Sequence, residues 1–148
     1  MHIHLDLVGG ISGDMFNGAM LNCFPGRERD LEKVMVAAGF SDLVRLESGL
    51  TNDGVLTGTR FKVLADTEAH HHRDYSEIKK ILKDSVLSEP TRDAALAIFE
   101  IIAIAEAEIH GKDVDSVAFH EVGAWDSIAD IVCAAYLITD TGVTSWSV

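Results

Sequence analysis

The sequence predicts an α/β or α+β fold, in which a small sheet made by an N-terminal strand and a hairpin is packed by helices. Residues 2–8 alternate between polar and apolar side chains, which is typical of a strand with one apolar face. Residues 43–65 contain two more alternating stretches around Asn52-Asp53-Gly54, which predicts an antiparallel hairpin. Residues 88–110 and 126–139 are apolar nearly all round, so we expect two buried helices in the second half.

A glycine turn follows the first strand. Gly9 to Gly13 separates the strand from a helix expected to start at Asp14, and free backbone N–H groups converge at such a helix start. The glycine spacing matches neither dinucleotide nor P-loop motifs, and Asp14 could simply cap the helix. The turn therefore remains a candidate site for a phosphate or a cation, with contacts from Gly10, Ser12, Gly13 and Asp14.

The length of 148 residues suits one domain. The most polar stretch predicts a soft boundary near residues 66–74, between an α/β unit and a mainly helical second part. Residues 143–148 have the pattern of another strand. We therefore expect residues 1–148 to form a single domain that is a partial N-terminal module of a longer protein.

The chain is acidic, with 24 Asp and Glu against 12 Lys and Arg and a formal charge of −12. This balance argues against nucleic acid or an anionic membrane as a partner, because both require positive charge. No apolar run approaches the roughly 18 residues of a membrane span. Cys23 and Cys133 lie in apolar helical patterns without a signal peptide, which predicts reduced, buried thiols in a cytoplasmic protein.

Three adjacent histidines, His70, His71 and His72, are the first candidate metal ligands. Neighbours in an extended chain point to opposite sides, so all three cannot bind one ion without a tight turn. Two of them could bind nickel, zinc or copper together with a ligand from elsewhere. The alternative is a solvated loop that titrates near neutral pH.

The second candidate is the pair His120-Glu121 with Asp126 and Asp130. Residues four apart lie on one helix face, so the two aspartates can point the same way. On a strand His120 and Glu121 face opposite sides, so only one of them is expected to share a pocket with Asp126. Helix capping would explain the aspartates but not the His-Glu pair, which favours a metal site.

Three sequence blocks together resemble the LarC family of nickel-insertion proteins. They are Gly-Ile-Ser-Gly-Asp-Met at residues 10–15, the histidine run before Arg73, and His-Glu-Val-Gly-Ala-Trp-Asp-Ser-Ile at residues 120–128. The resemblance implies a CTP-dependent nickel chelatase, a lyase that inserts Ni²⁺ into a pyridinium bis-thiocarboxylate mononucleotide to form the nickel-pincer cofactor. It covers part of the family's N-terminal half, so the CTP site is expected in a C-terminal part outside this chain.

The resemblance also implies roles for the candidate residues. The histidine run would capture Ni²⁺, the turn before the last helix would line the site where metal meets the precursor, and the glycine turn would contact the precursor's phosphate or a cation. Expected partners are the precursor and the CTP-binding part, and a homo-oligomer is left open. The alternatives are a non-catalytic metal carrier or sensor, or an assembly scaffold. The implied metal ligands are His70, His71, His72, His120, Glu121 and Asp126.

Overall fold

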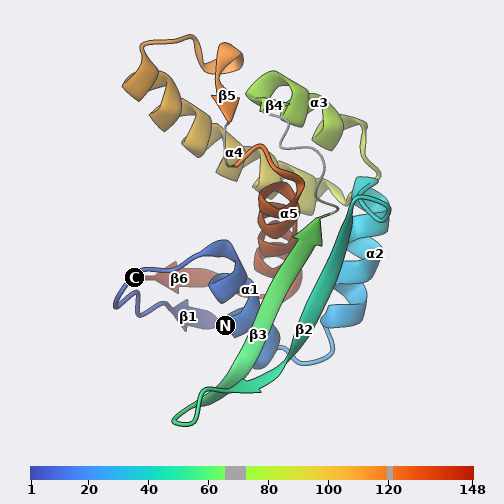
Figure 1. Ribbon diagram of the computed structural model, residues 1–148, viewed down its shortest axis with the longest axis vertical. Helices are drawn as coiled ribbons and strands as arrows, with labels where there is room; N and C mark the ends of the chain where they lie inside the picture. Colours follow the sequence, from blue (N-terminus) through green and yellow to red (C-terminus); the bar gives the residue numbers. More distant parts are fainter. Residues whose placement is uncertain (66–72, 120–121) are drawn as a thin grey trace.

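A computed structural model describes residues 1–65, 73–119 and 122–148 (Figure 1). Helices and strands are interspersed along the chain, which confirms the mixed fold class. The elements are β1 (His2–His4), α1 (Gly13–Cys23), α2 (Glu28–Ala38), β2 (Val44–Asn52), β3 (Thr57–Ala65), β4 (Arg73–Asp74), α3 (Tyr75–Asp84), α4 (Glu89–His110), a 3-10 turn (Val114–Ser116), β5 (Ala118–Phe119), α5 (Trp125–Asp140) and β6 (Ser145–Ser147).

Helix α5 occupies the centre of the fold (Figure 1). It packs against α1, α2, α4 and the hairpin strands β2 and β3. Its sequence is apolar after Asp130, so it can present buried side chains to neighbours on several sides. The expectation of a buried last helix is confirmed by its fully buried residues, Ile128, Ala129, Val132, Cys133, Ala135 and Leu137.

The described strands form three two-stranded sheets rather than one small sheet. The hairpin strands β2 and β3 pair antiparallel, as expected, and β4 pairs antiparallel with β5. Strand β1 pairs in parallel with β6 and not with the hairpin. It is also shorter than predicted: its pairing ends at His4, opposite Ser147, and the Gly10 amide then donates to the Leu7 carbonyl at 2.9 Å in a turn.

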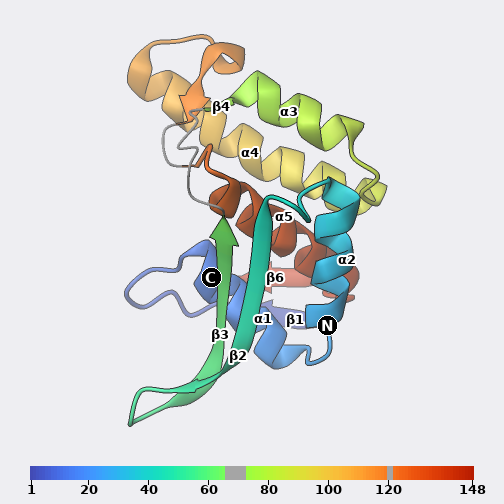
Figure 2. The same cartoon turned by 45° about the vertical axis from the view of Figure 1, so that its right-hand side comes forward.

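One face of the hairpin is packed and the other is open. Phe61 and Val63 are buried, while Arg60 and Lys62 between and beside them are exposed. Helix α1 crosses β3 at Gly18, where an added Cβ would lie 2.7 Å from the Thr59 carbonyl oxygen. The hairpin tip extends beyond the helices (Figure 2).

Helix α4 departs from the prediction of a fully buried helix. One stripe is buried, including Ala95, Phe99 and Ala103, but Ile101 is 69% exposed and Ile104 is 44% exposed. Its helical neighbours are α3 and α5, which cover only one side of it. In the part of the chain that the structure describes, no helix is both long and apolar enough to cross a membrane.

The prediction of two buried thiols was wrong for one of them. Cys133 is buried within α5, but Cys23 is exposed. Cys23 is the last residue of α1, and only the earlier part of that helix, including Met20 and Leu21, faces the core. The apolar pattern was read correctly as a helix, but the packed face ends before Cys23.

Candidate functional site

A glycine turn carries the chain from β1 into α1. Gly9 and Gly10 have φ angles of 86° and 94°, in the left-handed region that favours glycine. Helix α1 begins at Gly13, one residue earlier than predicted, and Ser12 is its N-cap residue without a side-chain cap. The predicted arrangement of strand, glycine turn and helix N-terminus is therefore present.

Asp14 lies in the first turn of α1. Its Oδ1 atom accepts a hydrogen bond from the backbone N–H of Met15 at 2.9 Å and another from the Ser12 hydroxyl. A carboxylate at this position interacts favourably with the helix dipole. It also places negative charge beside the N–H groups that an anionic ligand would need.

Two further carboxylates lie at the start of α5. Asp126 is in the first turn and exposed, and its Oδ1 atom accepts a hydrogen bond from the Ser127 backbone N–H at 2.8 Å. Asp130 is one turn further along and is half-buried. Residues four apart share a helix face, so both carboxylates lie on the same side of α5.

The N-terminal turns of α1 and α5 meet at Gly13 and Asp130. A Cβ added at Gly13 would lie 3.3 Å from the Asp130 Cβ, so glycine permits the close approach of the two helices. Asn17 is fully buried, and its Nδ2 atom donates to the Asp130 carbonyl at 3.1 Å and to Asp130 Oδ1 at 3.2 Å. Two motifs that are far apart in the sequence thus come together, and we call this cluster (Asp14, Asn17, Asp126 and Asp130) the carboxylate junction.

Electrostatics at the carboxylate junction favour positive charge. The pKa of Asp130 is raised to about 6, chiefly by partial burial and also by the nearby Asp14 and Asp126 carboxylates, while the hydrogen bond from Asn17 opposes the shift. The raised pKa means that the uncharged carboxyl, or one beside a cation, is more stable here than an uncompensated carboxylate. Within the described residues, Asn17 Oδ1 is buried without a hydrogen-bond partner.

Arg73 fixes the turn that leads into α5. It is 6% exposed, its Nη1 atom donates to the Gly123 carbonyl at 2.6 Å, and its guanidinium lies 3.9 Å from the centre of the Trp125 ring. Such a contact combines a charge-assisted hydrogen bond with a cation–π interaction. Arg73 also pairs with Phe119 in the β4–β5 ladder, so it joins the strand after the histidine run to the turn before α5.

Gly123 is required by this packing. A Cβ at this position would lie 2.6 Å from the Phe119 carbonyl oxygen and 3.0 Å from the Arg73 backbone nitrogen. Neither neighbour is a flexible side chain, so any larger residue would force the backbone apart. The glycine of the His-Glu-Val-Gly-Ala block therefore has a definite structural role.

Several predicted metal ligands lie outside the described residues. The structure describes Asp126, where it joins the carboxylate junction with Asp14. In residues 1–65, 73–119 and 122–148, no group of three or more His, Cys, Asp or Glu side chains is arranged to hold a metal ion. The predicted ligands outside these ranges are His70, His71, His72, His120 and Glu121.

Sequence reasoning missed two residues that organise the site. Asn17 was not considered, although a polar residue on the packed face of an apolar helix indicates a buried hydrogen bond. Arg73 was noted only as the end of the histidine run. Nothing in the sequence around Arg73 indicates that this basic residue is buried against Trp125.

Comparisons of the chain with a family profile and with curated proteins agree on one family. The profile described as nickel insertion protein matches residues 3–148. The chain belongs to the nickel insertion protein family, also known as the LarC family. No solved structure matches it.

Relatives cover nearly all of this chain. A "pyridinium-3,5-bisthiocarboxylic acid mononucleotide nickel insertion protein" of Geobacillus kaustophilus is 38% identical over 149 residues, covering 93% of this chain and 35% of the relative. A protein of the same name from Akkermansia muciniphila is 39% identical over 153 residues, covering 94% of this chain and 37% of the relative. A "putative nickel insertion protein" of Myxococcus xanthus is 36% identical, with coverages of 92% and 35%. The chain thus spans about a third of the length of these relatives.

Proposed function

We propose that this chain is the nickel-receiving N-terminal module of a nickel insertion protein, which metallates a pyridinium bis-thiocarboxylate mononucleotide. The observation that carries the proposal is the meeting of the Gly13 turn with the first turn of α5 at the carboxylate junction. The relatives' printed names supply the metal and the substrate class. Nickel is the cargo of the reaction in this account.

The β4–β5 ladder supports a single metal site built from both histidine-bearing segments. Arg73 is the register partner of Phe119. In the sequence, His72 comes directly before Arg73 and His120 directly after Phe119. Two imidazoles together with a carboxylate form a donor set that suits Ni²⁺. The proposed ligands are His70, His71, His72, His120, Glu121 and Asp126.

The carboxylate junction would act beside these ligands. Gly10, Ser12, Gly13 and Asp14 were expected to contact a phosphate or a cation, and the carboxylates that surround them support the cation. Negative charge raises the local concentration of a divalent metal near the turn. Asp126 belongs to the ligand set and to the junction, so it is the residue that would pass the metal between them.

The remaining partners are part of the same proposal. The proposed partners are the mononucleotide precursor and a C-terminal part that binds CTP, which would supply the triphosphate chemistry in a longer protein. The single-domain organisation of residues 1–148, with its soft boundary near residues 66–74, remains part of this proposal.

Calorimetric titration of the untagged protein with Ni²⁺ at neutral pH tests the proposal. We expect His120→Ala combined with Asp126→Ala to weaken nickel binding by more than about tenfold, because two ligands are lost. The matched control is His110→Ala combined with Asp84→Ala, which removes one exposed histidine and one exposed aspartate outside the site. The control should bind nickel as the wild type does.

Other outcomes would discriminate the alternatives. If the site variant retained full affinity and His71→Ala lost it, the chain would be a metal carrier that uses the histidine run alone. If the wild type bound no nickel, the nickel-receiving role would be wrong and a scaffold would remain. Addition of the precursor should strengthen nickel binding only if metal and precursor meet at one site.

A further inference from the structure

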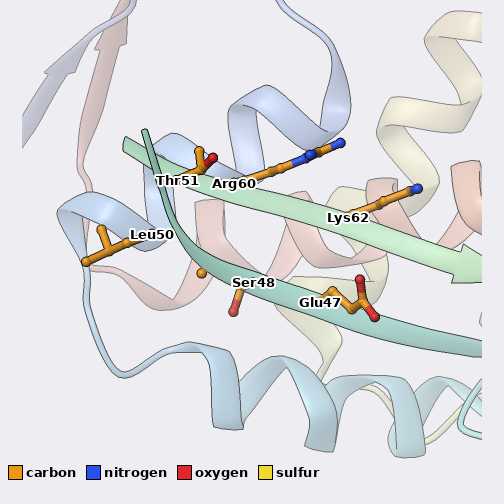
Figure 3. Close-up of a pocket in the computed structure, with 7 residues that line it drawn as sticks. Glu47, Ser48, Leu50, Thr51, Arg60 and Lys62 are labelled. Carbon is orange, nitrogen blue, oxygen red and sulfur yellow. The ribbon is translucent and has the colours of Figure 1, made fainter. Parts of the chain in front are cut away.

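The outer face of the hairpin carries a groove that the proposed nickel site does not use. The groove has a volume of about 370 Å³ and is formed entirely by β2 and β3 (Figure 3). The twist of the two strands makes this face concave. Its polar lining comes from Glu47, Ser48, Thr51, Arg60 and Lys62.

Two basic side chains in this groove carry exposed positive charge. Arg60 and Lys62 are exposed, and among the described residues neither side chain makes a hydrogen bond or an ion pair. The acid in the groove is Glu47, the register partner of Lys62, and its Oε1 atom accepts a hydrogen bond from Arg45 at 2.6 Å. An acidic chain of net charge −12 thus concentrates unpaired positive charge on one face of its hairpin.

Arg60 and Lys62 lie on the same face of β3. Residues two apart on a strand share a face, and Figure 3 shows Arg60 and Lys62 extending from β3 in the same direction. Gly49 is the register partner of Arg60. A Cβ at Gly49 would meet nothing within 4 Å, so no side chain fills the space opposite the guanidinium.

Hydroxyl groups complete the set of donors. Thr51 lies on the same face of β2 as Gly49, two residues further along, and is exposed. A guanidinium, an ammonium and a hydroxyl around an open backbone form a donor set that suits the oxygens of a phosphate group. The groove contains no buried apolar wall that would hold a neutral ligand, since Leu50 beside it is 79% exposed.

The charge distribution of the rest of the site makes this groove the better place for an anion. The helix N-terminus at Gly13 would otherwise attract a phosphate, but Asp14, Asp126 and Asp130 already surround it. The hairpin and that helix are neighbours, because α1 crosses β3 at Gly18 beside Thr59. The carboxylates around the start of α1 and the cations of β3 therefore lie on adjoining elements.

We propose that the outer groove of the β2–β3 hairpin binds the phosphate group of a mononucleotide, through Arg60, Lys62 and the Thr51 hydroxyl. The choice of a mononucleotide rests on the proposed function, whereas the recognition of a phosphate rests on the groove alone. The binding is weak and salt-dependent, because both cations are exposed and screened.

Backbone amide NMR titration of the whole chain tests the proposal. The probes are nicotinic acid mononucleotide, its dephosphorylated riboside, and inorganic phosphate, each added to millimolar concentration at low salt. We expect saturable shifts at residues 48–51 and 59–62 with the mononucleotide and with inorganic phosphate, but not with the riboside. Arg60→Gln combined with Lys62→Gln should weaken this binding by about tenfold.

A matched control is Arg29→Gln combined with Lys80→Gln, which removes the same charge from two exposed sites elsewhere. It should leave the hairpin shifts unchanged. The proposal is overturned if the riboside shifts the hairpin as strongly as the mononucleotide, if no hairpin amide moves, or if the control weakens binding as much as the groove variant does.

Nickel calorimetry on the same proteins separates this inference from the proposed function. The groove variant should bind nickel as the wild type does. Hairpin shifts without any nickel binding would overturn the nickel-receiving role and leave the phosphate groove standing. Nickel binding without hairpin shifts would overturn the groove alone.

Discussion

The carboxylate junction and the hairpin groove are built in opposite ways. At the junction, helix ends are packed so closely that Gly13 can carry no side chain without crowding Asp130, and the charges are negative. In the groove, Gly49 faces open space, and the exposed Arg60 and Lys62 side chains are positive. The two regions therefore differ in both packing and charge: carboxylates gather where the chain is tightly packed, and exposed cations where it is open.

The tightly packed turn before α5 should not tolerate added atoms, while the open hairpin groove should. Gly123→Ala places a methyl group 2.6 Å from a backbone oxygen, and we expect a loss of about 3 kcal/mol in the free energy of unfolding. Gly49→Ala is the matched control, expected to change stability by less than about 0.5 kcal/mol. Urea denaturation measures both, and equal losses would contradict the contrast between the regions.

Replacing a buried arginine should lower the stability of the protein more than replacing an exposed one. Arg73→Met removes the hydrogen bond to the Gly123 carbonyl and the contact with Trp125, and we expect a loss of about 2 kcal/mol. Arg45→Met breaks only the exposed pair with Glu47 and should cost less than about 1 kcal/mol. Thermal unfolding of the two variants compares them, and a smaller loss for Arg73→Met would show that the turn does not depend on its arginine.

Stability at the carboxylate junction should depend on pH. The folded pKa of Asp130 is raised to about 6 from an ordinary value of 3.8, so its contribution is greatest below 3.8 and is lost as pH rises through 6. Asparagine resembles the neutral carboxyl. We therefore expect Asp130→Asn to match the wild type near about pH 4 and to be more stable by about 1 kcal/mol near about pH 7.5, a modest gain because solvent screens this partly exposed group.

Asp126→Asn on the same helix serves as the comparison for Asp130→Asn, since Asp126 is exposed. Chemical denaturation at the two pH values measures the difference. A gain for Asp130→Asn that is the same at both pH values would show that carboxylate repulsion at the junction is not its cause.

The smallest expected change in stability comes from substitutions in the hairpin groove. Arg60→Gln combined with Lys62→Gln should change the free energy of unfolding by less than about 0.5 kcal/mol, because both side chains are exposed and make no bonds within the described residues. Thermal unfolding checks this expectation. A large loss would mean that these cations stabilise the hairpin and are not held free for a ligand.

The sequence predicted the elements better than their packing. Alternation identified the hairpin, and apolar periodicity identified α5, because each pattern reflects a local geometry. The pairing of β1 with β6 escaped prediction, since nothing in a three-residue strand specifies its partner. The exposed face of α4 was missed for a related reason. An apolar residue such as Ile101 was expected to be buried, but the positions of α3 and α5 decide which face of the helix is covered.

The candidate site was predictable in composition and not in geometry. The motifs around Asp14 and Asp126 were recognisable as carboxylates at helix starts. That they meet through Gly13 and Asn17 depends on how α1 and α5 cross, which no local pattern encodes. The groove was not predicted either, because in the sequence Arg60 and Lys62 have the pattern of the ordinary polar face of a strand.

Nickel-induced broadening of backbone amide signals tests the central claim most directly, because Ni²⁺ is paramagnetic and broadens the signals nearest to it. With less than one equivalent of Ni²⁺, the account predicts the strongest loss of signal at residues 12–14, 73–74 and 122–127, with the hairpin residues 48–51 little affected. Broadening centred on His2 and His4 in β1, or spread evenly over the exposed carboxylates, would contradict a nickel site at the turn between β5 and α5.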